Sequence, residues 1–310
     1  MTAQVTISPY LTSNALGSFG IDWNGFIQGC ALDSPAQRYR LAAGLLATTE
    51  TIPMWGGVAI SELVPTPGST TLPNSALGTV VSRATVCPTG GGWQNAAAGA
   101  TGQITGFSVF DQNYSAVNSP QSPVPLIGSG GQVNFYRFGS AARIPVQVAP
   151  SMGTLENAGI WGPVSWDFVN QQLVPGVAAY GADTVTNATW NSGTGVVDFT
   201  VTSGGELAVG DWFTISGIVA TGVGSAGVSY NGTFQAITGT ATTTIAAQFL
   251  TGSANNPGTY SSGGSLHAGG GYLPVQVLDV NIGASMTVIF NSGTGFATWN
   301  RSGNAAIIQI

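Results

Sequence analysis

Residues 288–299 read VIFNSGTGFATW, which is an apolar run, a turn of small polar residues and a second apolar run. The same five-residue turn, NSGTG, also occurs at 191–195, and each copy directly follows an aromatic residue, Phe290 or Trp190. Clusters of Gly, Ser, Thr and Asn between short apolar runs are typical of the turns that join antiparallel strands. The two copies therefore predict β-hairpins of similar design.

Further runs predict the same kind of structure. Alternating residues and many β-branched side chains indicate short strands bounded by Gly, Pro and Asn. These predicted strands are 104–110 ITGFSVF, 132–138 QVNFYRF, 143–148 RIPVQV and 164–169 VSWDFV. The segment 164–175, VSWDFVNQQLVP, also has the form of a hairpin, with Asn170 and Gln171 near its tip. The sequence therefore predicts an all-β protein.

Residues 36–50, AQRYRLAAGLLATTE, are the one candidate for a longer helix. Asp33 or Ser34 could cap this helix, and Pro35 could occupy its first turn. Gly44 lies inside the segment, where it costs about 1 kcal/mol relative to Ala in a helix. The sequence leaves open whether this segment is helical.

The block 182–269 differs from the chain on either side, because it is very rich in Thr, Gly and Ala. It contains regularly spaced predicted strands at 196–202, 211–218, 230–237 and 242–250. This spacing is typical of a small antiparallel sandwich. After Gly271 the residue pattern again resembles that of the first half of the chain. We therefore expect a module of residues 182–269 that is inserted into a host β domain of residues 1–181 plus 270–310. The alternative is two consecutive domains, with the tail belonging to the second.

Charged side chains are scarce. The chain has six Arg, no Lys and 12 acidic residues, and its charged fraction is 6%, against about 25% in typical soluble proteins. A surface of Ser, Thr, Asn, Gly and Ala costs little to desolvate, because the expensive step is to remove unpaired charges from water. Such a surface suits a protein that is held permanently against neighbours.

Five of the charged residues fall within 33–62, which predicts that this segment is part of a docking surface. Arg38 and Arg40 are the expected anchors, since guanidinium groups bind acidic groups in a bidentate manner. Met54 and Trp55 are expected to supply the apolar centre of the interface, where aromatic residues and Met are enriched. The alternative is that the two Arg pair with acidic residues of their own domain, Asp33 or Glu50.

Residue patterns that carry chemistry are few. His267 stands alone in a Gly- and Ser-rich stretch, and Cys30 and Cys87 are far apart, so no zinc spacing is present and both thiols are expected to be buried and reduced. Asp167 and Asp211 each lie beside aromatics, as acids that cleave glycosidic bonds often do, but a strand position and a turn position explain them. We expect no catalytic residue, cofactor or metal site, and therefore no enzyme.

Membrane and nucleic-acid partners are not expected. No apolar run reaches the length of a membrane-spanning helix, and the start of the chain, MTAQVTISPY, lacks the pattern of a secretory signal. A net charge of −6 opposes binding to a phosphate backbone, which requires many cationic contacts.

Longer phrases of the sequence resemble a known family. Residues 33–62, DSPAQRYRLAAGLLATTETIPMWGGVAISE, and the ending LPVQVLDVNIGASMTV at 273–288 with TGFATWNRSGNAAIIQI at 294–310 resemble head decoration, or capsid cement, proteins of tailed bacteriophages. The phrases AVGD at 208–211 and YNGT at 230–233 are similar to those of the Ig-like modules in phage virion proteins.

The resemblance implies a structural protein of the virion, made in the host cytoplasm, that binds the major capsid protein on the capsid exterior and stabilises the shell. It also implies a homo-oligomer, often a trimer in this family, with the Ig-like module projecting outward and able to contact the host surface weakly. The alternative is a tail-associated or tail-fibre protein. A bacterial adhesion module would need an export signal, and none is visible.

Overall fold

The computed structural model describes residues 26–32, 41–63, 79–84, 104–109, 124–153, 162–176, 182–203, 207–224 and 228–310. The regular structure of these residues is β-strand, apart from two short 3-10 helices, η2 at Pro150–Gly153 and η3 at Ser253–Asn255. The prediction of an all-β chain is therefore confirmed for the residues that the structure describes.

The strands follow one another in two groups and a closing hairpin. The first group is β1 Leu41–Leu46, β2 Ala59–Leu63, β3 Thr79–Arg83, β4 Gly106–Ser108, β5 Gln132–Arg137, β6 Arg143–Gln147, β7 Val164–Asp167 and β8 Gln172–Pro175. The second group is β9 Ala182–Trp190, β10 Val196–Val201, β11 Trp212–Ser216, β12 Val219–Thr221, β13 Gly232–Gln235, β14 Thr244–Gln248, β15 Thr259–Ser262 and β16 Ser265–Ala268. The closing hairpin is β17 Gln276–Asn291 and β18 Phe296–Gln309.

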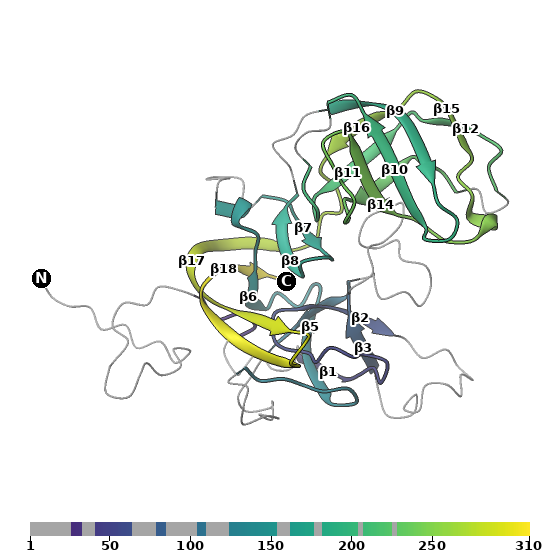
Figure 1. Cartoon of the computed structure of the whole chain (residues 1–310). Coiled ribbons are helices and arrows are strands. Elements are labelled where there is room, and N and C mark those ends of the chain that lie inside the picture. Colours follow the sequence, from purple (N-terminus) through teal and green to yellow (C-terminus); the bar gives the residue numbers. More distant parts are fainter. Residues whose placement is uncertain are drawn as a thin grey trace, which may run out of the picture.

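Strands β1 to β5 form a closed barrel in the order β1-β3-β2-β4-β5, with β5 returning to pair with β1 (Figure 1). Closure leaves no open sheet edge, which removes the usual site of unwanted strand pairing. Large apolar side chains fill the barrel interior, among them Leu46, Met54, Ile60, Val133 and Phe135.

The segment that could have been a helix is strand β1 over Leu41–Leu46, so the helical alternative is wrong there. Gly44 gives the physical reason. A Cβ at this position would lie 2.8 Å from the carbonyl oxygen of Thr79 and 3.0 Å from Val81 Cγ1, so the glycine allows β3 to approach β1 closely. The glycine that weakens a helix is therefore required by the barrel.

The closing hairpin is long and ties the end of the chain to its middle. Residues 305–309 of β18 pair with residues 143–147 of β6 in antiparallel register. Further along the hairpin, Val288 and Ala297 join the apolar cluster of the barrel interior. In Figure 1 the yellow hairpin arches from β6 across the barrel towards β1 and β5.

Strands β9 to β16 form a second lobe, which we define as residues 182–268. In the described chain these strands pair only with one another, as a sheet of order β13-β11-β16-β9-β10-β14 and a ribbon of β12 and β15 (Figure 1). Strand β9 pairs with β16 through residues 182–184 and with β10 through residues 185–190, so it passes from one half of the sheet to the other. Its apolar cluster is separate from the barrel and centres on Phe199, Phe213 and Phe234.

The predicted hairpins are present. The segment 164–175 forms β7 and β8, and Gln171 at its tip has a positive φ of 55°. The two NSGTG turns have the same geometry: Gly195 N donates to Asn191 O and Gly295 N donates to Asn291 O, both at 2.8 Å. Both glycines have φ of 72°. The repeated sequence therefore encodes the same turn in the second lobe and in the rest of the described chain, which we call the barrel lobe and define as the described residues before 177 and after 268.

The surroundings of the two turns differ, and this generates a prediction. A Cβ at Gly295 meets no atom within 4 Å, whereas at Gly195 it lies 2.5 Å from the carbonyl oxygen of Phe249. Gly295→Ala should lower the free energy of unfolding by about 1–2 kcal/mol, the cost of a left-handed alanine. Gly195→Ala should cost clearly more, because a steric clash adds to the same conformational cost. Equal losses in equilibrium denaturation would contradict this account of the two turns.

Candidate interaction surface

The outer face of the closing hairpin carries two exposed apolar side chains. Ile289 lies opposite Thr298, and Phe296 lies opposite Asn291. Directly opposite residues, and residues two apart along a strand, share a face, so Ile289 and Phe296 lie on the same side of the hairpin. Ile289 is 54% exposed and Phe296 is 41% exposed. We call the pair the hairpin patch.

The opposite face of the same hairpin packs on the barrel. Val288 and Ala297 are buried there, and the Phe290 ring contacts Trp55 with a centroid distance of 5.5 Å. The guanidinium of Arg83 lies over the Trp55 ring, 4.1 Å from its centroid. The hairpin patch is therefore carried on a well-packed support instead of a loose loop.

Arg83 at this support is a buried cation. It is 2% exposed, and its Nη1 donates to the carbonyl oxygen of Pro53 at 3.1 Å. Burial disfavours the charged form and lowers the pKa of Arg83 to about 10, while the nearby charge of Glu50 acts in the opposite direction. Glu50 Oε1 also accepts a hydrogen bond from the backbone N–H of Arg83 at 3.1 Å. Arg83 therefore remains protonated at neutral pH. Its guanidinium links the end of β3 to Pro53 and Trp55.

The hairpin segment that carries the patch has no charged residue. Residues 280–300 contain no Asp, Glu, Lys, Arg or His, and the turn between the strands is made of Asn, Ser, Gly and Thr. Among the described residues, the other large exposed apolar side chains lie elsewhere in the fold or farther along the hairpin: Val169, Val219, Val223, Tyr272 and Ile282. The patch offers a partner apolar contact with little desolvation of charge.

Two of the residues expected to form an interface, Met54 and Trp55, lie inside the fold. Met54 is fully buried and Trp55 is 8% exposed, and both belong to the barrel core. Trp55 supports the hairpin patch from below and does not form its surface. Arg38 and Arg40 lie outside the described residues, so their role as anchors stays a prediction.

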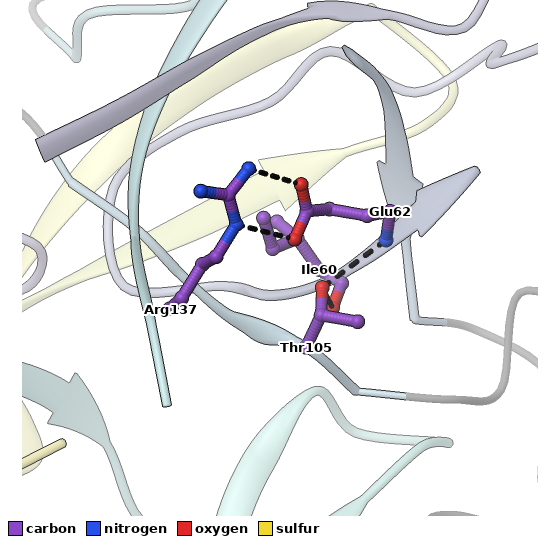
Figure 2. A network of polar contacts seen from close by, with 4 residues as sticks. All are labelled: Ile60, Glu62, Thr105 and Arg137. Carbon is purple, nitrogen blue, oxygen red and sulfur yellow. Dashed lines mark hydrogen bonds and ion pairs between the residues drawn. The ribbon is translucent and has the colours of Figure 1, made fainter. Parts of the chain in front are cut away.

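Two charges of the segment 33–62 are used inside the chain. Figure 2 shows Arg137 donating through Nε and Nη2 to the carboxylate of Glu62, at 2.8 and 2.7 Å. The backbone N–H of Glu62 donates to Thr105 Oγ1, whose hydroxyl donates to the carbonyl oxygen of Ile60. The hydrogen bonds to Glu62 raise the pKa of Arg137. Glu50, bonded to the Arg83 backbone, is the second charge satisfied within its own domain.

The remaining candidates are the residues considered for chemistry: two acidic residues, the histidine and the two cysteines. Asp167 and Asp211 come close enough for the charge of Asp167 to raise the pKa of Asp211, although burial is the larger cause. His267 is an exposed residue of β16 with Ser265 as a hydrogen-bond neighbour. Cys30 is buried, as expected, and Cys87 lies outside the described residues.

Within the described ranges, no group of three or more His, Cys, Asp or Glu side chains could hold a metal ion. No helix in that part of the chain has the length and apolar character to cross a membrane. No protein family, curated protein or solved structure matches this chain.

The hairpin patch was missed at the level of sequence, although a signal for it is present. In VIFNSGTGFATW the apolar residues do not alternate strictly, so both faces of the hairpin carry large apolar side chains. Only one face can pack on the barrel, and the other must present Ile289 and Phe296 to the outside.

The two faces should respond differently to substitution. Trp55→Ala removes a core side chain and the partner of Arg83 and Phe290, so it should lower the free energy of unfolding by about 3–5 kcal/mol. The double variant Ile289→Ser, Phe296→Ser should stay within about 0.5 kcal/mol of the parent protein, as is usual for surface changes. A large loss of stability in the double variant, measured by denaturant titration, would mean that this face is not a free surface.

Proposed function

We propose that this chain is a structural protein of a bacteriophage virion, which binds the outer surface of the capsid and stabilises it. The hairpin patch is the observation that carries the proposal: an exposed, uncharged apolar face on a rigid all-β support. The resemblance of residues 33–62, 273–288 and 294–310 to capsid cement proteins supports the major capsid protein as the partner.

The proposed mechanism is additive burial of surface, with no chemical step. A standard protein contact buries roughly 800 Å² on each partner, and apolar area contributes about 25 cal/mol per Å² before the costs of association. A contact with few charges loses little to desolvation. Many copies on one shell would each add a modest stabilisation. The stability of the shell against disruption would therefore grow with the number of copies bound.

The proposal also assigns a role to the second lobe. We take it as an Ig-like module, residues 182–269, inserted into the host domain of residues 1–181 plus 270–310. Three observations support this assignment: its strands pair only with one another in the described chain, its apolar cluster is separate, and β6 and β18 of the host pair across it in sequence. In Figure 1 the second lobe extends away from the barrel and the hairpin end, so a shell bound at the hairpin would leave this lobe pointing outward.

Binding to empty capsids tests the function directly. The purified protein should co-sediment with capsids of its phage, and the double variant Ile289→Ser, Phe296→Ser should lower occupancy at least about tenfold, because two apolar anchors are lost. Val219→Ser is the matched control: Val219 is exposed on β12 in the second lobe, so its change should leave occupancy unaltered.

The outcomes separate the two parts of the proposal. If the parent protein does not bind capsids but is found on tails in labelled particles, the capsid function is wrong. If the parent protein binds and the hairpin variant binds equally well, the hairpin patch is not the contact. Arg38→Ala with Arg40→Ala then tests the anchors predicted from the sequence.

A further inference from the structure

We propose that the junction between the two lobes is a pH-sensitive clamp, strengthened by acid, in which Asp211 of the second lobe directly follows Gly210, the residue that packs against the buried Asp167 of the barrel lobe. Protonation of Asp211 removes a repulsion between like charges across the junction. The orientation of the second lobe is therefore held more firmly in mildly acidic solution than at neutral pH.

The junction is a compact set of directional contacts. The Trp212 indole Nε1 donates to the carbonyl oxygen of Trp166 at 2.9 Å, and Trp212 packs in the apolar cluster of the barrel lobe although it begins β11. Gln235, which has no exposed surface, donates to the same Trp166 oxygen at 2.7 Å and to Gly210 O at 2.9 Å. Its Oε1 accepts from the Phe168 N–H at 3.1 Å. Any loosening of the junction must break several of these bonds together.

Asp167 places a buried carboxylate in the middle of this junction. It is 1% exposed and accepts hydrogen bonds from Val169 N at 2.8 Å, from Asn170 N at 3.0 Å and from Asn170 Nδ2 at 2.6 Å. Gly210 of the second lobe packs directly against it, since a Cβ on that glycine would lie 2.2 Å from Asp167 Oδ2. The carboxylate of one lobe is thus pressed against the chain of the other.

Asp211 follows Gly210 and brings the second carboxylate. Its Oδ2 accepts from Ala208 N at 2.9 Å, and its carbonyl oxygen accepts from Ala236 N at 2.8 Å. Burial raises the pKa of Asp211, the Ala208 hydrogen bond lowers it, and the charge of Asp167 raises it further. In the described chain, Asp167 is the charged group that acts on Asp211, and the groups bonded to Asp211 are uncharged. Glu206 lies outside the described residues.

The direction of the pH dependence follows from linkage. The charge of Asp167 acts on Asp211 across the junction, so this cause of the raised pKa makes Asp211 bind a proton more tightly when the junction is closed. Closure is therefore favoured when Asp211 is protonated and weakens as the pH rises through the raised pKa of Asp211.

Amide hydrogen exchange at the junction tests the proposal. The Phe168 amide donates across the junction to Gln235, so its protection, corrected for the intrinsic rate, reports closure. Between pH 4 and pH 7 this protection should fall by about threefold or more in the parent protein. Asp211→Asn keeps an oxygen for the Ala208 N–H and should abolish the fall. Asp198→Asn, an exposed change on β10, is the control and should leave the fall unchanged.

A carbon NMR titration of the Asp211 carboxyl gives a second readout that does not depend on the stability of the variants. Its pKa should exceed 3.8 in the parent protein and should decrease in Asp167→Asn, since one of its causes is removed. A fall in protection that persists in Asp211→Asn would overturn the proposal, as would an Asp211 pKa at or below 3.8.

Discussion

The pairing of β18 with β6 is the constraint on which the rest of the structure depends. It brings the last strand of the chain back to the middle and fixes the closing hairpin across the barrel. Because the hairpin continues past β6, its far end can reach the barrel, where Val288 and Ala297 enter the apolar core. One face of the hairpin end is buried by this packing, so the other face exposes Ile289 and Phe296 to a partner or to water.

The same pairing accounts for the place of the second lobe. Its strands lie in sequence between β8 and β17, and both of these neighbours are held by the barrel lobe. The two ends of the second lobe are therefore fixed close to the junction, where Trp212 and Gln235 bond to Trp166 and Phe168. A lobe anchored in this way has a defined direction, which a flexible linker would not provide.

Local patterns were sufficient to predict a large part of this fold. Turn residues and alternation predicted the hairpin at 164–175 and the two NSGTG turns, because short hairpins depend on neighbouring residues alone. The closed order of the barrel was not predictable, since β1 pairs with β3 in parallel and with β5 across long stretches of chain. Gly44 illustrates the same limit. Its structural role is to allow β3 to approach β1 closely, and no local sequence pattern contains that approach.

The candidate surface was less predictable than the fold. Charge pointed to residues 33–62, but Glu50 and Glu62 bond to Arg83 and Arg137 within the chain. The residue type of Trp55 favours an interface, whereas its burial depends on contacts with Arg83 and Phe290, which lie far away in the sequence. In a chain with so few charges, several of those in the described part serve internal contacts. The hairpin segment that carries the patch, residues 280–300, has no charged residue, and the two apolar side chains of the patch can be found only once the hairpin register is known.

An image of the intact virion by electron cryo-microscopy is the most direct test of the central claim, that the far end of the closing hairpin faces a capsid. The account predicts density for this chain on the outside of the head, with the β17–β18 turn against the shell and the second lobe outermost. Density confined to the tail, or a head-bound chain whose hairpin end points into solvent, would contradict it.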